Sequence, residues 1–343
     1  MNRLMWFIAA ICAIPPFAAS ARAQNTYTFT SFDIPFANAS NTRAFDINAR
    51  GDIVGRFFDS SMNGIPRGFH RYNDGTYALP IDAPVPNTGT VARGINSRGD
   101  IAGKFFDPKY PNEAHGFLLT AAGAFSGFDV NLPDVIAGQF GSTVANGINN
   151  LGTVVGEYTA FAAVPGCVGI FGLPRGFLRN ANGTYTEISF PGAIATIPAG
   201  IDDAGNIVGT YITVPNPPSA CNASALATAN GFVRDAKGNY STVDPPGSAG
   251  ALETVVTRIS DAGDIIGVYA TVQTTLGQIL GDSSIPAGVA GTYFVLSADG
   301  TFNAVPSPFA VPGQQAPLGI NPRSTLVGFY TDANGDHGFI ATR

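Results

Sequence analysis

Three histidines are the side chains in this sequence that could serve as bases or metal ligands. His115 and His337 each precede a Gly-Phe pair, and His70 follows one. Because imidazole titrates near neutral pH, such a residue can activate a serine nucleophile or bind a metal ion. The sequence holds no Gly-x-Ser-x-Gly turn, however, and His115 and His337 occupy the same place in a repeat. We therefore expect structural roles for these histidines and assign no catalytic residues.

Acidic residues are the second candidate source of chemistry. The segment from Asp332 to Asp336 resembles the beginning of a calcium loop, which needs glycine at its sixth position and an acid at its twelfth. Those positions hold His337 and Arg343, and a tight hairpin turn explains the same residues. The other acids are mostly aspartates in predicted turns, with no isolated pair of the kind that glycoside hydrolysis uses. The sequence therefore predicts no metal site and no cofactor.

Two Arg-Gly-Asp tripeptides, at residues 50–52 and 98–100, could mediate adhesion to an integrin-like receptor. Gly-Asp belongs to the repeat, however, and the residue before this place varies between copies: Arg50, Arg98, Leu151, Ala204, Ala262 and Ser324. Two arginines among six variable positions are ordinary. We therefore interpret both tripeptides as part of the repeat.

Two cysteines, Cys167 and Cys221, remain after a predicted signal peptide has removed Cys12. An even number of cysteines in an exported protein indicates a disulfide. Two lone cysteines and three histidines at these spacings do not make up a zinc site. We predict a disulfide between Cys167 and Cys221, and two free thiols are the alternative.

A sequence repeat organises the elements that must position these side chains. The phrase Ile-Asn-x-x-Gly-Asp-Ile-Val-Gly recurs at intervals of 48 to 61 residues, and its copies begin at Ile47, Ile95, Ile148, Ile201, Ile259 and Ile320. A Gly-Phe segment follows each copy, in degenerate form as Gly-Thr-Tyr-Phe at residues 291–294, and a Gly-Thr-Tyr segment with alternating polar residues comes next. A period of this length with four strand-like segments is typical of a propeller blade.

Each repeat unit predicts four short strands. The segment that ends at Ile-Asn forms the first strand, and the Asn and Gly after it form a turn. Asp-Ile-Val-Gly forms the second strand, and Gly-Phe with its apolar followers forms the third. A glycine-containing hairpin leads to the fourth strand, where aromatic and small polar residues alternate. The sequence therefore predicts an all-β fold, a six-bladed β-propeller in a single domain over residues 24–343.

The two ends of the repeat array complement each other. The last unit stops at Arg343 without a fourth strand, and residues 29–35 match the fourth strand at residues 185–191. A ring whose N-terminal strand completes the last blade leaves no sheet edge unpaired. The alternatives are an open stack of repeats, which would usually carry polar caps, and two sandwiches. We predict the closed ring.

The repeat resembles that of the bacterial extracellular repeat proteins of the HAF type, named for a His-Ala-Phe tripeptide. Here the tripeptide is His-Gly-Phe at residues 115–117 and 337–339, and Arg67, Arg175 and Asn230 replace the histidine elsewhere. The resemblance covers residues 25 to 343. It implies a secreted, propeller-like protein, and it supplies no reaction or catalytic residues.

The first 23 residues have the features of an export signal. Arg3 precedes an apolar run from Leu4 to Ile14, and Ala-Arg-Ala at residues 21–23 is a cleavage sequence that predicts a mature start at Gln24. The run is too short to span a bilayer. We therefore expect a secreted protein, extracellular or periplasmic, without a membrane span.

Composition and charge exclude other classes. Charged residues are 12% of the chain and only four are Glu, whereas hydrophobic residues are 45%, so a mainly helical or disordered chain is excluded. The 24 acidic and 18 basic residues give a net charge of −6, and loss of Arg3 and Arg22 would make it −8. Without a basic cluster, nucleic acid and anionic membrane surfaces are poor partners.

Three long connections between second and third strands suggest where function resides. They cover roughly Thr159–Pro174, Thr213–Ala229 and Thr271–Ala290 in blades three to five, and the two cysteines lie in the first two. Equivalent loops emerge on one face of a ring, where binding sites are commonly built, and neutral drift in tolerant loops is the alternative. The scarcity of His and Glu favours binding over catalysis. We expect a monomeric, non-enzymatic scaffold for a protein or glycan partner; the alternative is a secreted hydrolase or lyase with its site at the central channel mouth.

Overall fold

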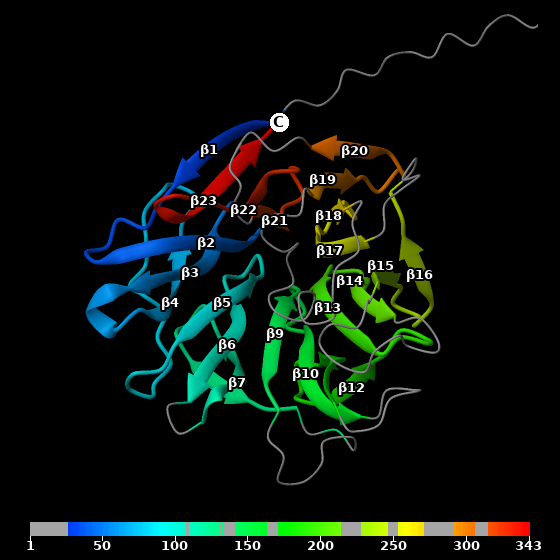
Figure 1. Ribbon diagram of the computed structural model, residues 1–343, viewed down its shortest axis with the longest axis horizontal. Helices are drawn as coiled ribbons and strands as arrows, with labels where there is room; N and C mark the ends of the chain where they lie inside the picture. Colours follow the sequence, from blue (N-terminus) through cyan, green and yellow to red (C-terminus); the bar gives the residue numbers. More distant parts are fainter. Residues whose placement is uncertain are drawn as a thin grey trace, which may run out of the picture.

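Antiparallel β-sheets arranged around a central channel make up the molecule. The computed structural model describes residues 27–107, 110–130, 132, 141–162, 171–213, 228–245, 253–270, 291–305 and 315–343. These residues form six sheets that surround the channel like the blades of a propeller, in chain order (Figure 1). The prediction of an all-β, six-bladed propeller is confirmed.

The first three blades follow one another along the chain. Blade 1 contains β2 (Ala39–Ile47), β3 (Ile53–Asp59), a 3-10 turn η1 (Ser60–Met62) and β4 (Ile65–Arg71). Blade 2 contains β5 (Thr90–Ile95), β6 (Ile101–Asp107), β7 (Tyr110–Leu119) and β8 (Phe125–Phe128). Blade 3 contains β9 (Thr143–Ile148), β10 (Val154–Ala162), β11 (Phe171–Arg179) and β12 (Tyr185–Ile188). The first strand of each blade is innermost.

The last three blades repeat this arrangement. Blade 4 contains β13 (Ala195–Ile201), β14 (Ile207–Thr213), β15 (Thr228–Arg234) and β16 (Tyr240–Val243). Blade 5 contains β17 (Glu253–Ile259), β18 (Ile265–Ala270), β19 (Gly291–Leu296) and β20 (Phe302–Val305). Blade 6 contains β21 (Gln315–Ile320), β22 (Leu326–Asp332), β23 (Gly335–Thr342) and β1 (Thr28–Phe32).

Blade 1 departs from the four-strand pattern. Its sheet has three strands, β2-β3-β4, and the fourth segment makes two isolated bridges, Gly68 to Ile81 and Arg71 to Tyr77. The sequence after Tyr77 is Ala-Leu-Pro, and a proline lacks the N–H that a continuous ladder needs. The segment therefore follows the course of a fourth strand without continuous pairing.

The N-terminal strand closes the ring. β1 pairs antiparallel with β23, in a register that runs from Thr28 opposite Thr342 to Phe32 opposite Gly338. The blue β1 lies beside the red β23 in Figure 1. The predicted closure is confirmed, and it joins the first and last described segments of the chain in one sheet.

The Gly-Phe pairing of the repeat builds the core of each blade. The Phe of the third strand, which directly follows Gly in all blades except blade 5, is at most 1% exposed: Phe69, Phe117, Phe177, Phe232, Phe294 and Phe339. Its ring lies against the Gly at the end of the second-strand phrase, so that a Cβ on Gly209 would come 2.9 Å from Phe232 and 2.2 Å from the carbonyl of Ile197. The absence of a side chain at this glycine therefore makes room for the phenylalanine ring.

The Asn of the repeat ties neighbouring blades together. In blade 1, Oδ1 of Asn48 accepts hydrogen bonds from the amides of Arg50, Gly51 and Asp52, which closes the turn around Gly51 at a φ of +99°. Its Nδ2 donates to the carbonyl of Asn96 in the next blade at 3.0 Å. The same inter-blade bond recurs for Asn96, Asn149 and Asn321. The repeated Asn therefore forms the turn and stabilises the ring.

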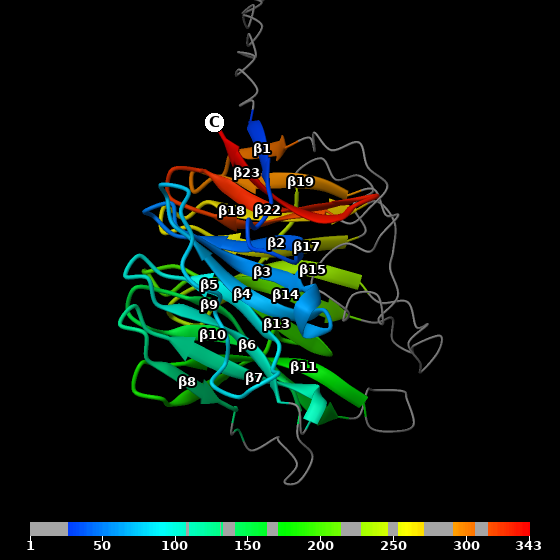
Figure 2. The same cartoon turned by 90° about the vertical axis from the view of Figure 1, so that its left-hand side faces the viewer.

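The ring has two faces, which Figure 2 shows from the side. We call the face with the turns after the first strands the turn face, and the face with the connections between second and third strands the mouth face. The described residues contain no helix long and apolar enough to cross a membrane. The predicted signal peptide (residues 1–23), the mature start at Gln24, both cysteines and most of the three long loops lie outside the described residues.

Candidate functional site

Every innermost strand carries a β-bulge near its turn-face end. The bulged residue, three places before the Asn of the repeat or its equivalent, is skipped in the pairing with the second strand. The six bulged residues are Phe45, Arg93, Asn146, Ala199, Thr257 and Leu318. Because a bulge interrupts the ladder, it leaves backbone carbonyls that need another hydrogen-bond donor.

Arg258 supplies those donors from the centre of the ring. It is 7% exposed and donates to the bulge carbonyl of each of the other five blades: Nε to Leu318 (3.4 Å), Nη1 to Asn146 (2.9 Å) and Ala199 (2.7 Å), and Nη2 to Phe45 (3.2 Å) and Arg93 (2.9 Å). A guanidinium has five N–H donors in a fixed plane, and each of them finds a carbonyl here. One side chain therefore contacts all of the other five blades.

Arg258 is paired with Asp46, which the sequence analysis did not single out. Nε of Arg258 lies 3.2 Å from Oδ1 of Asp46, and both side chains are less than 10% exposed. The two residues hold equivalent places, immediately before the Ile of the repeat, where the other four copies have Gly94, Gly147, Gly200 and Gly319. These two departures from a glycine position were the sequence signal for the contact.

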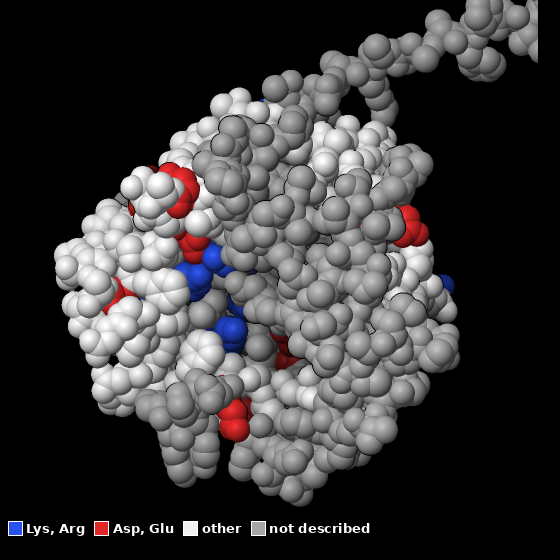
Figure 3. Space-filling model, viewed as in Figure 1, with Lys and Arg blue, Asp and Glu red and all other residues white. Residues whose placement is uncertain are grey.

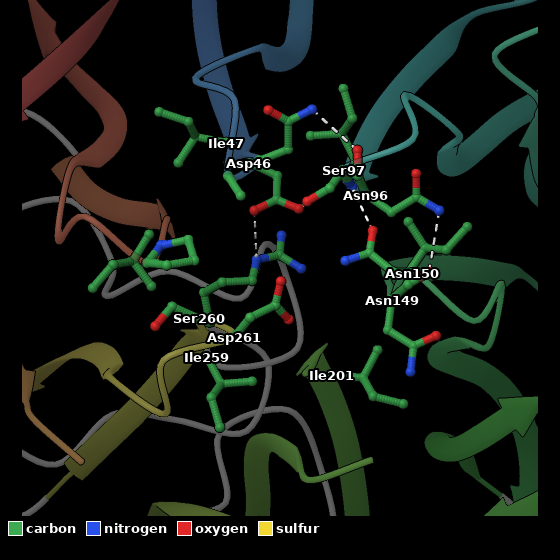
Figure 4. A pocket seen from close by; sticks show the side chains of 17 residues that line it. Asp46, Ile47, Asn96, Ser97, Asn149, Asn150, Ile201, Ile259, Ser260 and Asp261 are labelled. Carbon is green, nitrogen blue, oxygen red and sulfur yellow. Dashed lines mark hydrogen bonds and ion pairs between the residues drawn. The ribbon is translucent and has the colours of Figure 1, made fainter. Parts of the chain in front are cut away.

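The glycines explain why only two side chains fit at this level. A Cβ on Gly94 would lie 3.0 Å from Cα of Gly147, and one on Gly319 would lie 2.7 Å from Cα of Asp46. The six strands are therefore pressed together here, and Asp46 and Arg258 fill the remaining space. The cavity that they line on the turn face has a volume of only about 40 Å³ (Figure 4).

The position of Asp46 destabilises the ionised form of its carboxyl group. Burial raises its pKa to about 6, although the Arg258 guanidinium and the amides of Ile95 and Ile47 act in the opposite direction. Burial also lowers the pKa of Arg258. Both shifts show that the pair loses more hydration than a surface pair would. The turn-face end of the channel is therefore closed by a desolvated ion pair.

Charged side chains gather at the opposite end, the channel mouth. The residue after the second-strand Gly is charged in three consecutive blades, as Arg56, Lys104 and Glu157, and uncharged in the others, as Thr210, Val268 and Phe329. Together with three neighbours they form what we call the mouth cluster: Arg43, Arg56, Arg93, Lys104, Glu157 and Asp336. Figure 3 shows Lys and Arg side chains beside a hollow near the middle of this face.

Asp336 holds the blade-1 side of the mouth cluster. Its Oδ2 lies 2.5 Å from Nε of Arg43 and 3.5 Å from Nη2 of Arg56, and its Oδ1 accepts from the Thr331 hydroxyl at 2.7 Å. Burial raises the pKa of Asp336, but the hydrogen bonds from Arg43 and Thr331 outweigh it, so the net shift is downward. Asp336 therefore remains a carboxylate shared by two arginines.

Aromatic rings support the cations of the mouth cluster. Cζ of Arg43 lies 4.0 Å from the ring centre of Phe329, and Cζ of Arg56 lies 4.3 Å from that of Phe58. Nζ of Lys104 lies 5.2 Å from the centre of Phe106, the residue equivalent to Phe58. Such cation–π contacts favour one orientation of a charged group. The charges are therefore placed before any ligand arrives.

Arg93 and Glu157 form the side of the mouth cluster toward blade 3. Nη1 of Arg93 donates to Oδ1 of Asn146 at 3.1 Å, and its Cζ lies 5.2 Å from the ring centre of Phe45. Oε2 of Glu157 is shielded from solvent without a hydrogen bond among the described residues. Burial raises the pKa of Glu157, although the positive charges of Arg93 and Lys104 lower it.

A cavity of about 260 Å³ adjoins Glu157 on the mouth face. Blades 3 and 4 line it with Ser142, Val144, Glu157, Tyr158, Thr159, Gly172, Pro174 and Ile197. Hydroxyl and carboxyl groups stand beside apolar side chains in this lining. Its volume lies slightly below the roughly 300–1,000 Å³ of ordinary small-molecule sites, and polar side chains make up half of its lining residues.

His115 and His337 each pair with an aspartate of their own blade. Nδ1 of His115 lies 2.9 Å from Oδ1 of Asp129, and Nδ1 of His337 lies 3.0 Å from Asp33, the residue equivalent to Asp129 after the fourth strand. Arg67 takes the place of the histidine in blade 1 and pairs in the same way with Asp82. These pairs join third to fourth strands, away from the mouth cluster.

Burial lowers the pKa of both His70 and His337, but only His70 ends with a lowered pKa. Nε2 of His337 also lies 3.1 Å from Oδ1 of Asp332, and the carboxylates Asp33 and Asp332 together outweigh burial and raise its pKa. Asp332 and Asp336 therefore engage side chains of the protein rather than facing one another in a loop. The described residues contain no group of three His, Cys, Asp or Glu side chains that could hold a metal ion.

The two Arg-Gly-Asp tripeptides lie in the turns of the turn face. Oδ2 of Asp52 lies 3.0 Å from Nη2 of Arg50, and its Oδ1 accepts from the amide of Asn73. Asp100 makes the equivalent contacts with Arg98 and the amide of Ala121. Each aspartate is nearly buried and connects two turns of its own blade, which supports their interpretation as part of the repeat.

The fold defines the protein as a β-propeller, and comparisons with known proteins agree. No family model and no curated protein matches the chain. A crystal structure of a protein of unknown function from Dyadobacter fermentans is similar, with 10% identity and a TM-score of 0.50 over 91% of this chain and 98% of that chain. Virginiamycin B lyase from Staphylococcus aureus has 12% identity and a TM-score of 0.46 over 92% of this chain and 100% of that chain. At 10% identity the likeness to the Dyadobacter fermentans protein shows the fold alone.

Proposed function

We propose that this protein is a binding propeller that holds a protein or glycan ligand at its mouth face. One observation carries the proposal: the two ends of the channel differ. Arg258 and Asp46 close the turn-face end, whereas Arg56, Lys104 and Glu157 place charges at equivalent positions of three blades at the mouth. The long loops predicted to bind also belong to the mouth face.

The mouth cluster has the properties of a preorganised binding surface. Its cations pack on phenylalanine rings, and Asp336 forms ion pairs with two of these cations. The side chains therefore lose little conformational entropy when a ligand binds. The side chains project from strands of a closed ring rather than from loops alone, which favours precise placement. Binding through this surface requires no chemical step.

Glu157 supports a second candidate, a hydrolase or lyase with its site at the same mouth. Its pKa is raised by burial, and it lines a cavity beside two cations, as suits a general acid or base. Glycoside hydrolysis normally uses two carboxyl groups, however, and the cavity lining among the described residues contains one. Binding is therefore the preferred proposal.

A glycan array probed with the protein lacking residues 1–23 tests the proposal. The wild type, the mouth variant R56Q/K104Q and the turn-face control R50Q/R98Q are compared. Both variants lose two positive charges, and the control pair lies about half exposed on the other face. We expect a glycan that binds the wild type and the control but binds the mouth variant at least about tenfold more weakly. Equal binding by all three proteins would contradict the proposal.

The alternative is decided on the same ligand. Cleavage products that appear with the wild type and disappear with E157Q would establish the hydrolase or lyase instead. Binding that persists in E157Q without any cleavage by the wild type supports a binding protein.

We also propose that the protein is exported and that Cys167 pairs with Cys221. Both ideas rest on the sequence, including its resemblance to extracellular HAF-type repeat proteins. Expression with the complete N-terminus should yield a product that begins at Gln24 outside the cytoplasm. Mass mapping without reduction should find the two cysteines in one linked peptide pair, and free thiols at both positions would contradict the disulfide.

A further inference from the structure

The chemistry of the mouth points to a particular class of ligand, given that the proposed function is correct. Asp336 binds both Arg43 and Arg56, and Glu157 lies in the field of both Arg93 and Lys104. The mouth cluster thus contains four cations, Arg43, Arg56, Arg93 and Lys104, and two acidic side chains. This local arrangement contrasts with the net charge of −6 of the whole chain. Such a local positive field attracts an anionic group to the mouth.

Arg93 is the cation best placed to bind that group. Asn146 fixes its Nη1, and the ring of Phe45 packs against its guanidinium. These contacts hold the guanidinium in one orientation before a ligand binds. A carboxylate matches the planar fork of a guanidinium best.

The adjoining cavity indicates what carries the carboxylate. Ser142, Glu157 and Thr159 offer hydroxyl and carboxyl groups, whereas Val144 and Ile197 offer apolar surface. A sugar ring presents hydroxyl groups at its edge and C–H groups on its faces. The volume of about 260 Å³ is slightly below the roughly 300–1,000 Å³ of ordinary ligand pockets, which suits a single sugar residue.

We infer that the mouth binds an acidic saccharide, with a uronate carboxylate on Arg93 and Lys104 and the sugar ring in the cavity beside Glu157. Val144 lines the cavity and lies on β9, the strand whose Asn146 accepts the hydrogen bond from Arg93, so the carboxylate and ring positions adjoin. The cations of blades 1 and 2 would then contact the carboxylates of further uronate units in a short oligosaccharide. A nucleic acid, by contrast, would extend over the acidic remainder of the surface.

Calorimetric titration with tri-galacturonate tests the inference, and the neutral trisaccharide maltotriose serves as the matched probe. The proteins are the wild type, R93Q, R93K and the turn-face control R98Q, all checked for an unchanged melting temperature. We expect the wild type and R98Q to bind tri-galacturonate at least about tenfold more tightly than maltotriose. R93Q should lose at least about tenfold in affinity, and R93K should recover only part of it because lysine lacks the planar fork.

The outcomes separate this inference from the proposed function. Equal affinity for both sugars, with binding weakened in R56Q/K104Q, would overturn the acidic ligand and leave a mouth that binds neutral glycans. An R93Q variant that folds and binds tri-galacturonate like the wild type would also overturn it. A short single-stranded DNA that displaces the sugar would show general anion attraction instead of saccharide recognition. Binding of neither sugar would refute the inference, and the glycan array would then decide the proposed function.

Discussion

Arg258 of the fifth blade reaches Asp46 of the first blade across the centre of the ring, with 3.2 Å between Nε and Oδ1. The pair stands at two of the six positions where the repeat otherwise has glycine. The guanidinium also donates hydrogen bonds to five bulge carbonyls. It thereby satisfies carbonyls that the strands leave unpaired, as a capping residue does at the end of a helix. The pair thereby closes the turn-face end of the channel.

Replacing the pair by the glycine of the repeat tests this role. R258G should lower the free energy of unfolding by about 3–5 kcal/mol, since it leaves Asp46 buried without its partner. The double variant D46G/R258G should cost at least about 1 kcal/mol less than the sum of the single variants, because it removes both charges. Urea unfolding of the four proteins measures this coupling, with R98A as an exposed control. Strictly additive losses would contradict the pairing.

The raised pKa of Asp46 predicts a pH dependence of stability. In the folded protein its pKa is about 6, against an ordinary value of 3.8, so the folded state holds this proton more tightly than the unfolded state. Its contribution to stability is therefore greatest below about pH 4 and declines as the pH rises to about 6. The unfolding free energy of the wild type minus that of D46N should therefore decrease as the pH rises over that range. A difference that stays flat or increases with pH would contradict the desolvation of Asp46.

The Gly-Phe pairing predicts a large cost for one added methyl group. G209A would place a Cβ 2.2 Å from the Ile197 carbonyl and 2.9 Å from Phe232. We expect a loss of about 3 kcal/mol in unfolding free energy, near the upper end for overpacked sites. G123A serves as the control, because Gly123 lies in a turn at a φ of +88° with nothing within 4 Å of an added Cβ. Its strain should cost only about 1 kcal/mol, and equal losses would refute the packing argument.

Closure by the N-terminal strand predicts that the chain depends on its first residues. Removal of residues 24–36 deletes β1 and leaves β23 as an open edge. It also uncovers Gly338, against which the ring of Phe32 packs. Thermal unfolding should occur at a much lower temperature than in the intact mature chain. As a control, L79A changes an exposed side chain and should leave the melting temperature unchanged. An unaltered melting temperature in the deletion would contradict closure.

The architecture could be predicted because residues that recur in every repeat unit determine it. The Asn turn, the second-strand Gly and the third-strand Phe, for example Phe117 and Phe232, recur at equivalent places in the repeat. The last repeat lacks a fourth strand, and the N-terminal segment has the sequence of one. The site was harder to predict because it depends on departures from the repeat. Asp46 and Arg258 interrupt a glycine position, and nothing local to either residue indicates that a ring brings them together.

The mouth cluster was hidden for a related reason. Arg56, Lys104 and Glu157 occupy one variable position of the repeat, and their grouping emerges only when blades 1 to 3 are placed side by side. The sequence pointed through its long loops to the mouth face, where we propose binding, and it predicted structural roles for the histidines. For His115 and His337, pairing with the Asp after a fourth strand explains those roles in physical terms.

Lysine footprinting in the presence and absence of tri-galacturonate tests the central claim most directly. Lys104 belongs to the mouth cluster, and Lys237 lies exposed in the hairpin between β15 and β16 on the turn face. Acylation of each lysine is followed by mass spectrometry. The account predicts that bound sugar slows acylation of Lys104 and leaves Lys237 unchanged. Protection of Lys237, or an unchanged rate at Lys104 under saturating sugar, would contradict it.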